Sequence, residues 1–298
     1  DRSRGLGDVY KRQILMRIIM TLWQGLCHLP TSWHPPMGRL LGKFLLIVAK
    51  DRKKIAQANI SLCLPNLSAD DQKKILNNNF TLLGKSIIET GIAWFWSDAK
   101  IKKLIDYEIF GLDLLSIEHS SNGNLIIFKH SQHLELDARL LAINAEIYGV
   151  SRAHNSASIN KIQNKGRLSS IKDTADKNNP RQFMKWLKDG KNVLYAIDQD
   201  YGWDHSVKLK FFNQETATIT TPKRIIDITG SNLIFMNSYY EKNKIVLKLE
   251  ALNSFGIDDK GLAQKINDLM EEKILLHPAE YLWAHRRFKS TLGKSFYK

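Results

Sequence analysis

The amino-acid sequence predicts an α/β fold: a mixed, mostly parallel sheet flanked by helices, with membrane-associating helices near the N-terminus. The main observation is that strand-like and helix-like stretches alternate after residue 123, an order typical of sheets with helices on both faces. A second observation is that two apolar segments before residue 50 run into a basic cluster. The expected strands are 124–129, 146–150, 192–198, 232–240 and 244–252, and the expected helices are 133–144, 181–189, 216–229 and 260–276.

The composition is that of a folded chain with an excess of positive charge. Of the 298 residues, 43% are hydrophobic, which is enough for a buried core. Lys and Arg number 44 against 30 Asp and Glu, a formal net charge of +14, so we expect an anionic partner: nucleic acid, an anionic membrane, or an acidic protein or lipid. Cys27 and Cys63 are too few and too isolated for a disulfide framework or a zinc site, which favours a reducing compartment.

The first 13 residues, DRSRGLGDVYKRQ, are polar and basic and lack the periodicity of a core helix. Their tail, DVYKRQ, looks like the in-frame translation of a sequencing-library adapter. We therefore expect residues 1–13 to be a disordered sequencing artefact and leave them out of the fold. The remaining chain divides into a membrane-associating helical segment, 14–50, and one larger domain, 51–298.

Two apolar stretches precede that domain. Residues 14–29 include Arg17 and Gln24 and fall short of the roughly 20 residues needed to cross a bilayer. Residues 40–49 lead straight into the basic residues Lys50, Arg52, Lys53 and Lys54. Apolar helices beside such a cluster are typical of an anchor that lies in, or dips through, the interface of an anionic membrane. Two core helices with a solvated basic end would give the same pattern.

Residues 67–92 have the pattern of a long helix. Ser68 can cap its start, acids follow at Asp70 and Asp71, and apolar residues recur at helical spacing. Three consecutive aromatic residues, 94–96, follow the helix. They fit a core or an interface, and they would also suit the mouth of a lipid groove.

The segment FKHSQHLELDARLL holds the first candidates for chemistry. His130 follows a strand, where ligand sites of open α/β sheets gather, and Glu135 lies one turn into the next helix. Two residues five apart on one helix point about 140° away from each other, so the pair can meet only if His130 lies outside the helix. A carboxylate bound to one imidazole nitrogen makes the other a general base. His133 and Asp137 compete with this pair, and a structural role for either histidine stays open.

Three further segments hold candidate ligands. Asp198 and Asp200 end a strand, either as turn residues or as carboxylates on the same sheet edge as the histidine. Arg167 lies in what reads as a polar loop and could clamp a phosphate or be solvated. The segment WAHRRFK near the C-terminus offers either a solvated face or an anion-binding patch for substrate, formed by Arg286, Arg287 and Lys289.

Several short segments occur together over about residues 25–290: Leu29-Pro30, Arg52-Lys53, NISLCLPNLS, HSQHLE, GRLSS, DQDYG, FFNQETAT and WAHRRFK. In this order and spacing they resemble the late acyltransferases of lipid A biosynthesis, the lauroyl and myristoyl transferases of the lysophospholipid acyltransferase superfamily. The chain departs from the family where Lys210 replaces a frequent proline, and where Ser169 and Ser170 replace a frequent second arginine.

The resemblance implies a glycerol-phosphate-acyltransferase-like fold for 51–298 and assigns its site residues. The family's signature is a histidine, four residues and an acid, which only His130 and Glu135 match; the competing pair has one residue too few and is left as ordinary helix residues. By the same resemblance Arg167 lies near the phosphorylated acceptor. Asp198 and Asp200 match the family's acidic DxDYG segment.

The resemblance also implies an acyltransferase that moves a fatty acyl chain from acyl carrier protein to a hydroxyl of a (Kdo-)lipid A precursor. His130 would take the hydroxyl proton, Glu135 would orient and charge His130, and backbone amides at 131–133 would hold the oxyanion. Direct transfer from a thioester needs no metal, cofactor or covalent enzyme intermediate. The expected partners are acyl carrier protein, the lipid A precursor and the bacterial inner membrane, with the catalytic domain facing the cytoplasm and no nucleic acid bound.

Other functions stay open on the sequence. Acyl transfer to another glycolipid or to a glycerophospholipid would use the same residues. A non-catalytic lipid-binding protein would explain the anchor, but it gives no reason for His130, Glu135 and Arg167 to occur together. A nucleic-acid-binding protein would explain the charge, but no recognised binding motif is present.

Overall fold

A seven-stranded sheet lies at the centre of the computed structural model, which describes residues 2–116, 122–151 and 157–298. Its strands follow the order β1-β9-β8-β2-β5-β3-β4, and each neighbouring pair is parallel except β8 with β9. The predicted mixed, mostly parallel sheet is confirmed. The strands are β1 (Tyr107–Phe110), β2 (Asn124–Phe128), β3 (Ile147–Ser151), β4 (Thr174–Asp176), β5 (Asn192–Ala196), β8 (Asn232–Glu241) and β9 (Lys244–Ala251).

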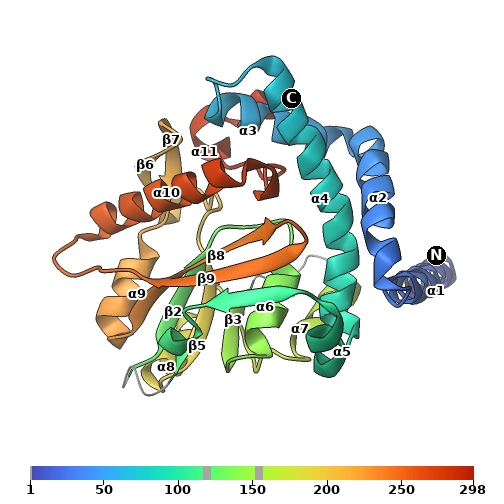
Figure 1. Ribbon diagram of the computed structural model, residues 1–298, viewed down its shortest axis with the longest axis horizontal. Helices are drawn as coiled ribbons and strands as arrows, with labels where there is room; N and C mark the ends of the chain where they lie inside the picture. Colours follow the sequence, from blue (N-terminus) through green and yellow to red (C-terminus); the bar gives the residue numbers. More distant parts are fainter. Residues whose placement is uncertain (1, 117–121, 152–156) are drawn as a thin grey trace.

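Helices cover both faces of this sheet, as predicted (Figure 1). One face is covered by α5, α6 and the C-terminal half of α4, and the other by α8, α9, α10 and the N-terminal half of α4. These helices are α4 (Ala69–Phe95), α5 (Asp98–Leu104), α6 (Leu134–Ala142), α8 (Pro180–Lys188), α9 (Thr221–Thr229) and α10 (Asp259–Leu276). The predicted cap of α4 is confirmed, because the Ser68 hydroxyl accepts the Asp71 N–H at 3.1 Å.

Strand β2 shows how one sequence run serves both faces. All of its residues are buried. Leu125 and Ile127 belong to the core under α8, α9 and α10, whereas Ile126 and Phe128 belong to the core under α6, because successive side chains of a strand point to opposite faces. A central parallel strand therefore needs a continuous apolar run.

One predicted helix is wrong over its first part. The helix expected at 216–229 begins at Thr221, because residues Gln214–Thr218 form strand β7. This strand pairs with β6 (Val207–Phe211) in a separate antiparallel hairpin. The run QETAT carries two β-branched threonines that are buried in the strand, and Pro222 marks the true helix start.

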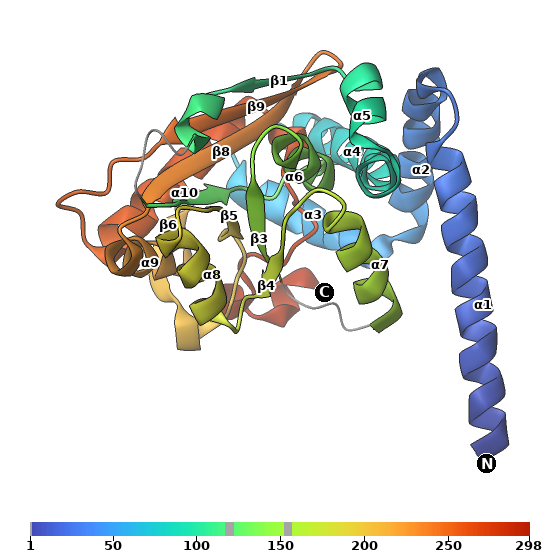
Figure 2. The ribbon, with the colours of Figure 1, turned by 90° about the horizontal axis from the view of Figure 1, so that it is seen from below.

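Three α-helices of the described residues precede α4: α1 (Arg2–Cys27), α2 (His34–Val48) and α3 (Lys50–Cys63). Figure 2 shows α1 as a long helix along one side of the molecule. Residues 2–13, which we expected to be disordered, form the first part of α1, whereas their origin as a sequencing artefact stays a prediction. Helix α2 packs closely on α4. The two backbones are so near at Gly42 that an added Cβ would lie 2.4 Å from the Phe80 carbonyl oxygen.

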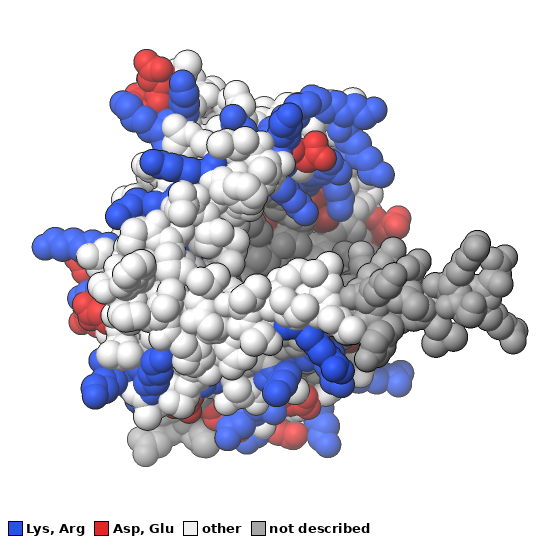
Figure 3. Space-filling view, turned by 90° about the vertical axis from the view of Figure 1, so that its right-hand side faces the viewer, with Lys and Arg blue, Asp and Glu red and all other residues white. Residues whose placement is uncertain are grey.

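The outer surface of α1 and α2 exposes large apolar side chains. They are Ile14, Leu15, Ile18, Ile19, Leu22 and Leu26 on α1, and Leu40, Phe44, Ile47 and Val48 on α2; we call this set the α1–α2 surface. Figure 3 shows this side of the molecule as a broad uncharged area with Lys and Arg side chains above and below it. Over the described residues, no helix combines the length and the apolar character needed to cross a membrane. Membrane association stays a prediction.

Candidate active site

A cavity of about 840 Å³ opens where strands β2, β3 and β5 end. Its apolar wall includes Phe128, Leu134 and Phe183. Its polar lining includes five residues that the sequence singled out for substrate binding or catalysis, His130, Glu135, Arg167, Asp200 and Lys289, together with Gln199 and His285. We expected a ligand site at the carboxyl ends of the strands, and these side chains line the cavity at that edge of the sheet.

His130 and Asp198 face each other across the ends of two neighbouring parallel strands. The register of β2 and β5 pairs Phe128 with Ala196, and continuing it by two residues brings His130 opposite Asp198. The His130 backbone N–H donates to Asp198 Oδ2 at 2.8 Å, and His130 Nδ1 hydrogen-bonds to Asp198 Oδ1. One carboxylate therefore fixes both the backbone and the ring of His130.

Asp198 also determines where His130 carries its proton. An ionised carboxylate only accepts, so Nδ1 donates to it and Nε2 keeps a lone pair; the Gln199 amide nitrogen lies 3.2 Å from this Nε2. Burial lowers the pKa of His130, but the charge of Asp198 and the hydrogen bond to it outweigh burial and raise that pKa overall. Burial raises the pKa of Asp198, whereas its contacts with His130 and the charge of Arg287 bring it down to about 2.

Glu135 binds Arg167 and Trp94 in the described part of the chain, and not His130. Arg167 Nε donates to both carboxylate oxygens at 3.1 and 3.2 Å, and Trp94 Nε1 donates to Oε2 at 2.9 Å. The predicted direct hydrogen bond between His130 and Glu135 is therefore wrong for this structure. Asp198, two residues after the end of β5, binds the His130 ring instead. Glu135 and His130 nevertheless line the same cavity.

Arg167 is the last residue of α7 (Ala157–Arg167), rather than part of a polar loop as we expected. The segment has few apolar residues, which hid its helical character. A Cβ added to the neighbouring Gly166 would lie 2.3 Å from the Trp94 ring. Glycine at this position lets α7 approach α4 closely enough for Arg167 and Trp94 to share Glu135.

Asp200 lines the cavity, but its carboxylate is used to hold the polypeptide. It accepts the Gly202 N–H at 2.9 Å, the Ser290 N–H at 2.8 Å and the Ser290 hydroxyl at 2.6 Å. These bonds tie the loop after β5 to the start of α11 (Lys289–Leu292). Of the two acids predicted in DQDYG, Asp198 contacts His130 and Asp200 braces the loop.

The predicted basic patch near the C-terminus is divided by the fold. Arg287 is 2% exposed and donates to the Ala217 carbonyl at 2.7 Å and the Thr216 hydroxyl at 2.9 Å. Arg286 is exposed and lies outside the cavity lining, whereas Lys289 is part of it. Of these three basic residues, Lys289 lies at the site. Arg287 affects it through its positive charge, which helps to lower the pKa of the buried Asp198.

Sequence reasoning missed some residues of the site. Gln199 lies between the two acids of DQDYG, and His285 lies inside WAHRRFK, so both were within quoted motifs. Burial lowers the pKa of His285 to about 4. The Gln132 N–H, expected to help hold an oxyanion, instead donates to the Glu280 carbonyl at 2.8 Å.

Similarity to known proteins extends over most of the chain. A family model described as bacterial lipid A biosynthesis acyltransferase matches residues 9–290. The chain is 34% identical to the lipid A biosynthesis lauroyltransferase of Escherichia coli K12, over 85% of this chain and 84% of that protein. It is 32% identical to the palmitoleoyltransferase of the same organism, with the same coverage. It is 31% identical to a lipid A biosynthesis acyltransferase of Haemophilus influenzae, over 91% of this chain and 89% of that protein. The chain therefore belongs to the bacterial lipid A biosynthesis acyltransferase family.

Proposed function

We propose that this protein transfers a fatty acyl chain from acyl carrier protein to a hydroxyl of a (Kdo-)lipid A precursor. The observation that carries the proposal is His130, whose Nδ1 is held by Asp198 while its ring lines a large cavity. The relatives' names, lauroyltransferase and palmitoleoyltransferase, support a fatty acyl donor. A non-catalytic lipid-binding protein would have no use for a part-buried histidine–carboxylate pair at the cavity wall.

In the proposed mechanism His130 Nε2 removes the proton from the acceptor hydroxyl. The hydroxyl oxygen attacks the thioester carbonyl, a C–O bond forms, and a tetrahedral oxyanion results. When this intermediate collapses, the C–S bond breaks and the leaving thiolate takes the proton from His130. Asp198 stabilises the imidazolium between these steps, because it is ionised and bound to Nδ1.

Glu135 acts through Arg167 in this proposal. The carboxylate holds the guanidinium at the cavity wall by two hydrogen bonds from Nε. Arg167 and Lys289, which both line the cavity, supply positive charge for the phosphorylated acceptor or the developing oxyanion. Glu135 thus stays a proposed catalytic-site residue, with a role that differs from orienting His130.

The apolar part of the cavity provides room for the acyl chain. Phe128, Leu134 and Phe183 line it, and Gly149 on β3 contributes to the same wall. A Cβ added to Gly149 would lie 3.6 Å from the Thr174 methyl group, an ordinary contact. A larger side chain there would fill space that the acyl chain uses, so Gly149 is suited to set donor length.

The α1–α2 surface is proposed to bind the bacterial inner membrane from the cytoplasmic side. Its exposed apolar side chains are followed in the sequence by Lys50, Arg52 and Lys54, which are also exposed. Apolar burial and attraction to anionic headgroups act together in such contacts. Membrane contact would place the cavity within reach of a lipid acceptor.

The proposal is tested with purified protein, acyl carrier protein thioesters of several chain lengths, and two acceptors offered separately: a lipid A precursor and a lysophospholipid. We expect the precursor to gain the mass of one acyl chain and the lysophospholipid to stay unchanged. Transfer to the lysophospholipid alone would replace the proposal with a glycerophospholipid acyltransferase. Binding of both lipids without transfer would replace it with a lipid-binding protein.

A further inference from the structure

A buried cluster of charged residues lies behind the cavity and takes no part in the mechanism proposed above. His133, Asp137 and Glu280 are 2%, 0% and 6% exposed, and the described cavity lining includes none of them. They come from different parts of the chain: the residue before α6, α6 itself, and the short 3₁₀-helix Pro278–Glu280. His133 is therefore not the ordinary helix residue that the sequence suggested.

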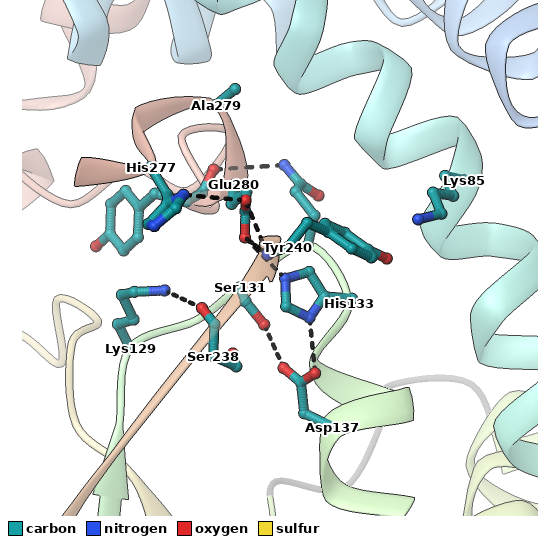
Figure 4. Close-up of polar contacts among 12 residues, drawn as sticks. Lys85, Lys129, Ser131, His133, Asp137, Ser238, Tyr240, His277, Ala279 and Glu280 are labelled. Atoms are coloured by element: carbon teal, nitrogen blue, oxygen red, sulfur yellow. Dashed lines mark hydrogen bonds and ion pairs between the residues drawn. The ribbon is translucent and has the colours of Figure 1, made fainter. Parts of the chain in front are cut away.

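Figure 4 shows the His133 ring between the two carboxylates. Nδ1 lies 2.7 Å from Asp137 Oδ1, and Nε2 lies 3.1 Å from Glu280 Oε2. A neutral imidazole carries one N–H, whereas ionised carboxylates only accept, so an imidazolium is the form that satisfies both contacts. Burial lowers the pKa of His133, but the charge of Asp137 and the hydrogen bonds to both carboxylates outweigh burial and raise it to about 9.

Other charged residues lie close to the cluster of His133, Asp137 and Glu280. Lys129 is 2% exposed and donates to the Ser238 carbonyl at 2.9 Å. Burial lowers the pKa of Lys129 overall, whereas the negative charges of Glu280 and Asp137 act to raise it. On the α4 side, Lys85 and Glu89 form an ion pair at 3.4 Å beside Tyr240, whose ring lies 4.6 Å from that of His133. Removing one cation would leave buried negative charge without a partner, which is costly.

The same cluster joins the loop that carries His130 to the C-terminal segment. The Leu282 N–H donates to the His130 carbonyl at 3.0 Å, and the Gln132 N–H donates to the Glu280 carbonyl at 2.8 Å. The Ser131 hydroxyl donates to Asp137 at 2.7 Å. Backbone bonds on both sides of Ser131 and the side chain of His133 thus connect the same two segments.

We propose that His133 is a positioning residue: held between Asp137 and Glu280, it fixes the His130 loop against the C-terminal segment and keeps the His130 ring aimed into the cavity. This role rests on the proposed function of His130 as the base. It predicts that removing the His133 charge slows the chemical step and leaves substrate binding intact, because the cluster holds the loop next to His130 while none of its three residues lines the cavity.

The test compares wild type with His133→Gln, Glu280→Gln and the double variant, at a temperature well below the lowest Tm. We expect His133→Gln to lower kcat about tenfold or more with little change in KM, because small displacements of a catalytic group are costly. The double variant is expected to recover much of this loss, because Glu280→Gln removes the charge that His133→Gln leaves unpaired. Asn192→Ala is the matched control: Asn192 is buried and hydrogen-bonded at the opposite end of β5, so it should lower Tm without lowering kcat.

A second measurement reads the position of His130 without substrates. The rate at which diethyl pyrocarbonate modifies His130, followed by mass spectrometry, should rise in His133→Gln because the ring is less restrained. If His133→Gln fails to fold, Glu280→Gln is decisive through the same readouts, with an expected fall in kcat. An unchanged kcat and modification rate in a folded variant would overturn the positioning role. An inactive wild type would overturn the proposed function, and the modification rate would still decide on His133.

Discussion

His130 lies two residues after the end of β2, and Asp198 lies two residues after the end of β5. Because these strands are parallel and in register, the Asp198 carboxylate hydrogen-bonds to His130 Nδ1. The geometry has one direct consequence. A single carboxylate, delivered by a neighbouring strand, selects the tautomer in which Nε2 can accept a proton.

Asp198→Asn should lower kcat by at least about a thousandfold, because an amide nitrogen facing Nδ1 favours the tautomer that cannot act as a base at Nε2. KM should change little. The measurement is the initial rate of acyl transfer at saturating donor and acceptor. Asp200→Asn is the matched control, since Asp200 binds Ser290 and Gly202 instead. Equal losses in both variants would show that the two acids act through loop structure alone.

Glu135→Ala and Arg167→Ala should each lower kcat/KM by at least about a hundredfold, because together they form one charged unit at the cavity wall. Their double variant should lose little more than the worse single variant, since each change already breaks the pair. Trp94→Phe, which keeps the ring but removes the donor to Glu135, should have a smaller effect. Losses that multiply in the double variant would mean that Glu135 and Arg167 act separately.

The pH dependence of kcat/KM should show an acid limb above the usual histidine pKa of 6.5, because His130 must be neutral to accept a proton and its pKa is raised. In Asp198→Asn the residual activity should have its limb at lower pH. The sign follows because the charge that raises the pKa is gone, whereas the burial that lowers it remains. If the limb stays at the same pH or moves to higher pH in Asp198→Asn, it does not report the titration of His130.

Gly149→Val should shift the preferred donor to a shorter acyl chain, because the new side chain would extend into the cavity that Gly149 lines. Gly149→Ala should give a smaller shift in the same direction, since one methyl group is worth only about 1 kcal/mol of discrimination. The measurement is kcat/KM for a series of acyl carrier protein thioesters. An unchanged preference in both variants would place the end of the acyl pocket elsewhere.

Replacing Phe44 and Ile47 on the α1–α2 surface with glutamate should abolish binding to vesicles that contain anionic lipid, because both side chains are exposed and apolar. Sedimentation with vesicles measures the bound fraction. The control is Phe255→Glu, since Phe255 is 93% exposed in the segment before α10. Loss of binding in the control alone would move the membrane contact to that other side of the protein.

The sequence predicted the architecture well because apolar periodicity is local. The continuous apolar run of β2 and the capped start of α4 can be read within a few residues. The sequence also put His130 and Asp198 at the ends of strands, and a shared sheet edge was one of the two interpretations of Asp198. Their pairing could not be read, because it depends on β2 and β5 being neighbours, and strand order is a long-range property of the fold.

The contacts of Glu135 with Arg167 and of His133 with Glu280 could not be predicted for the same reason. Glu135 meets Arg167 because Gly166 lets α7 approach Trp94, a contact between three helices. His133 meets Glu280, 147 positions later in the chain. A motif that fixes residue types at a spacing identifies the participants at a site, whereas tertiary contacts determine which carboxylate each histidine uses.

The central claim, that His130 serves as the base for acyl transfer to a lipid A precursor, is tested most directly by mass spectrometry of the precursor. Purified protein is incubated with that precursor and an acyl carrier protein thioester, in parallel with His130→Asn. We predict a product heavier by one acyl chain with the wild type and a rate at least about a thousandfold lower with the variant. Equal product formation by wild type and His130→Asn would contradict the account.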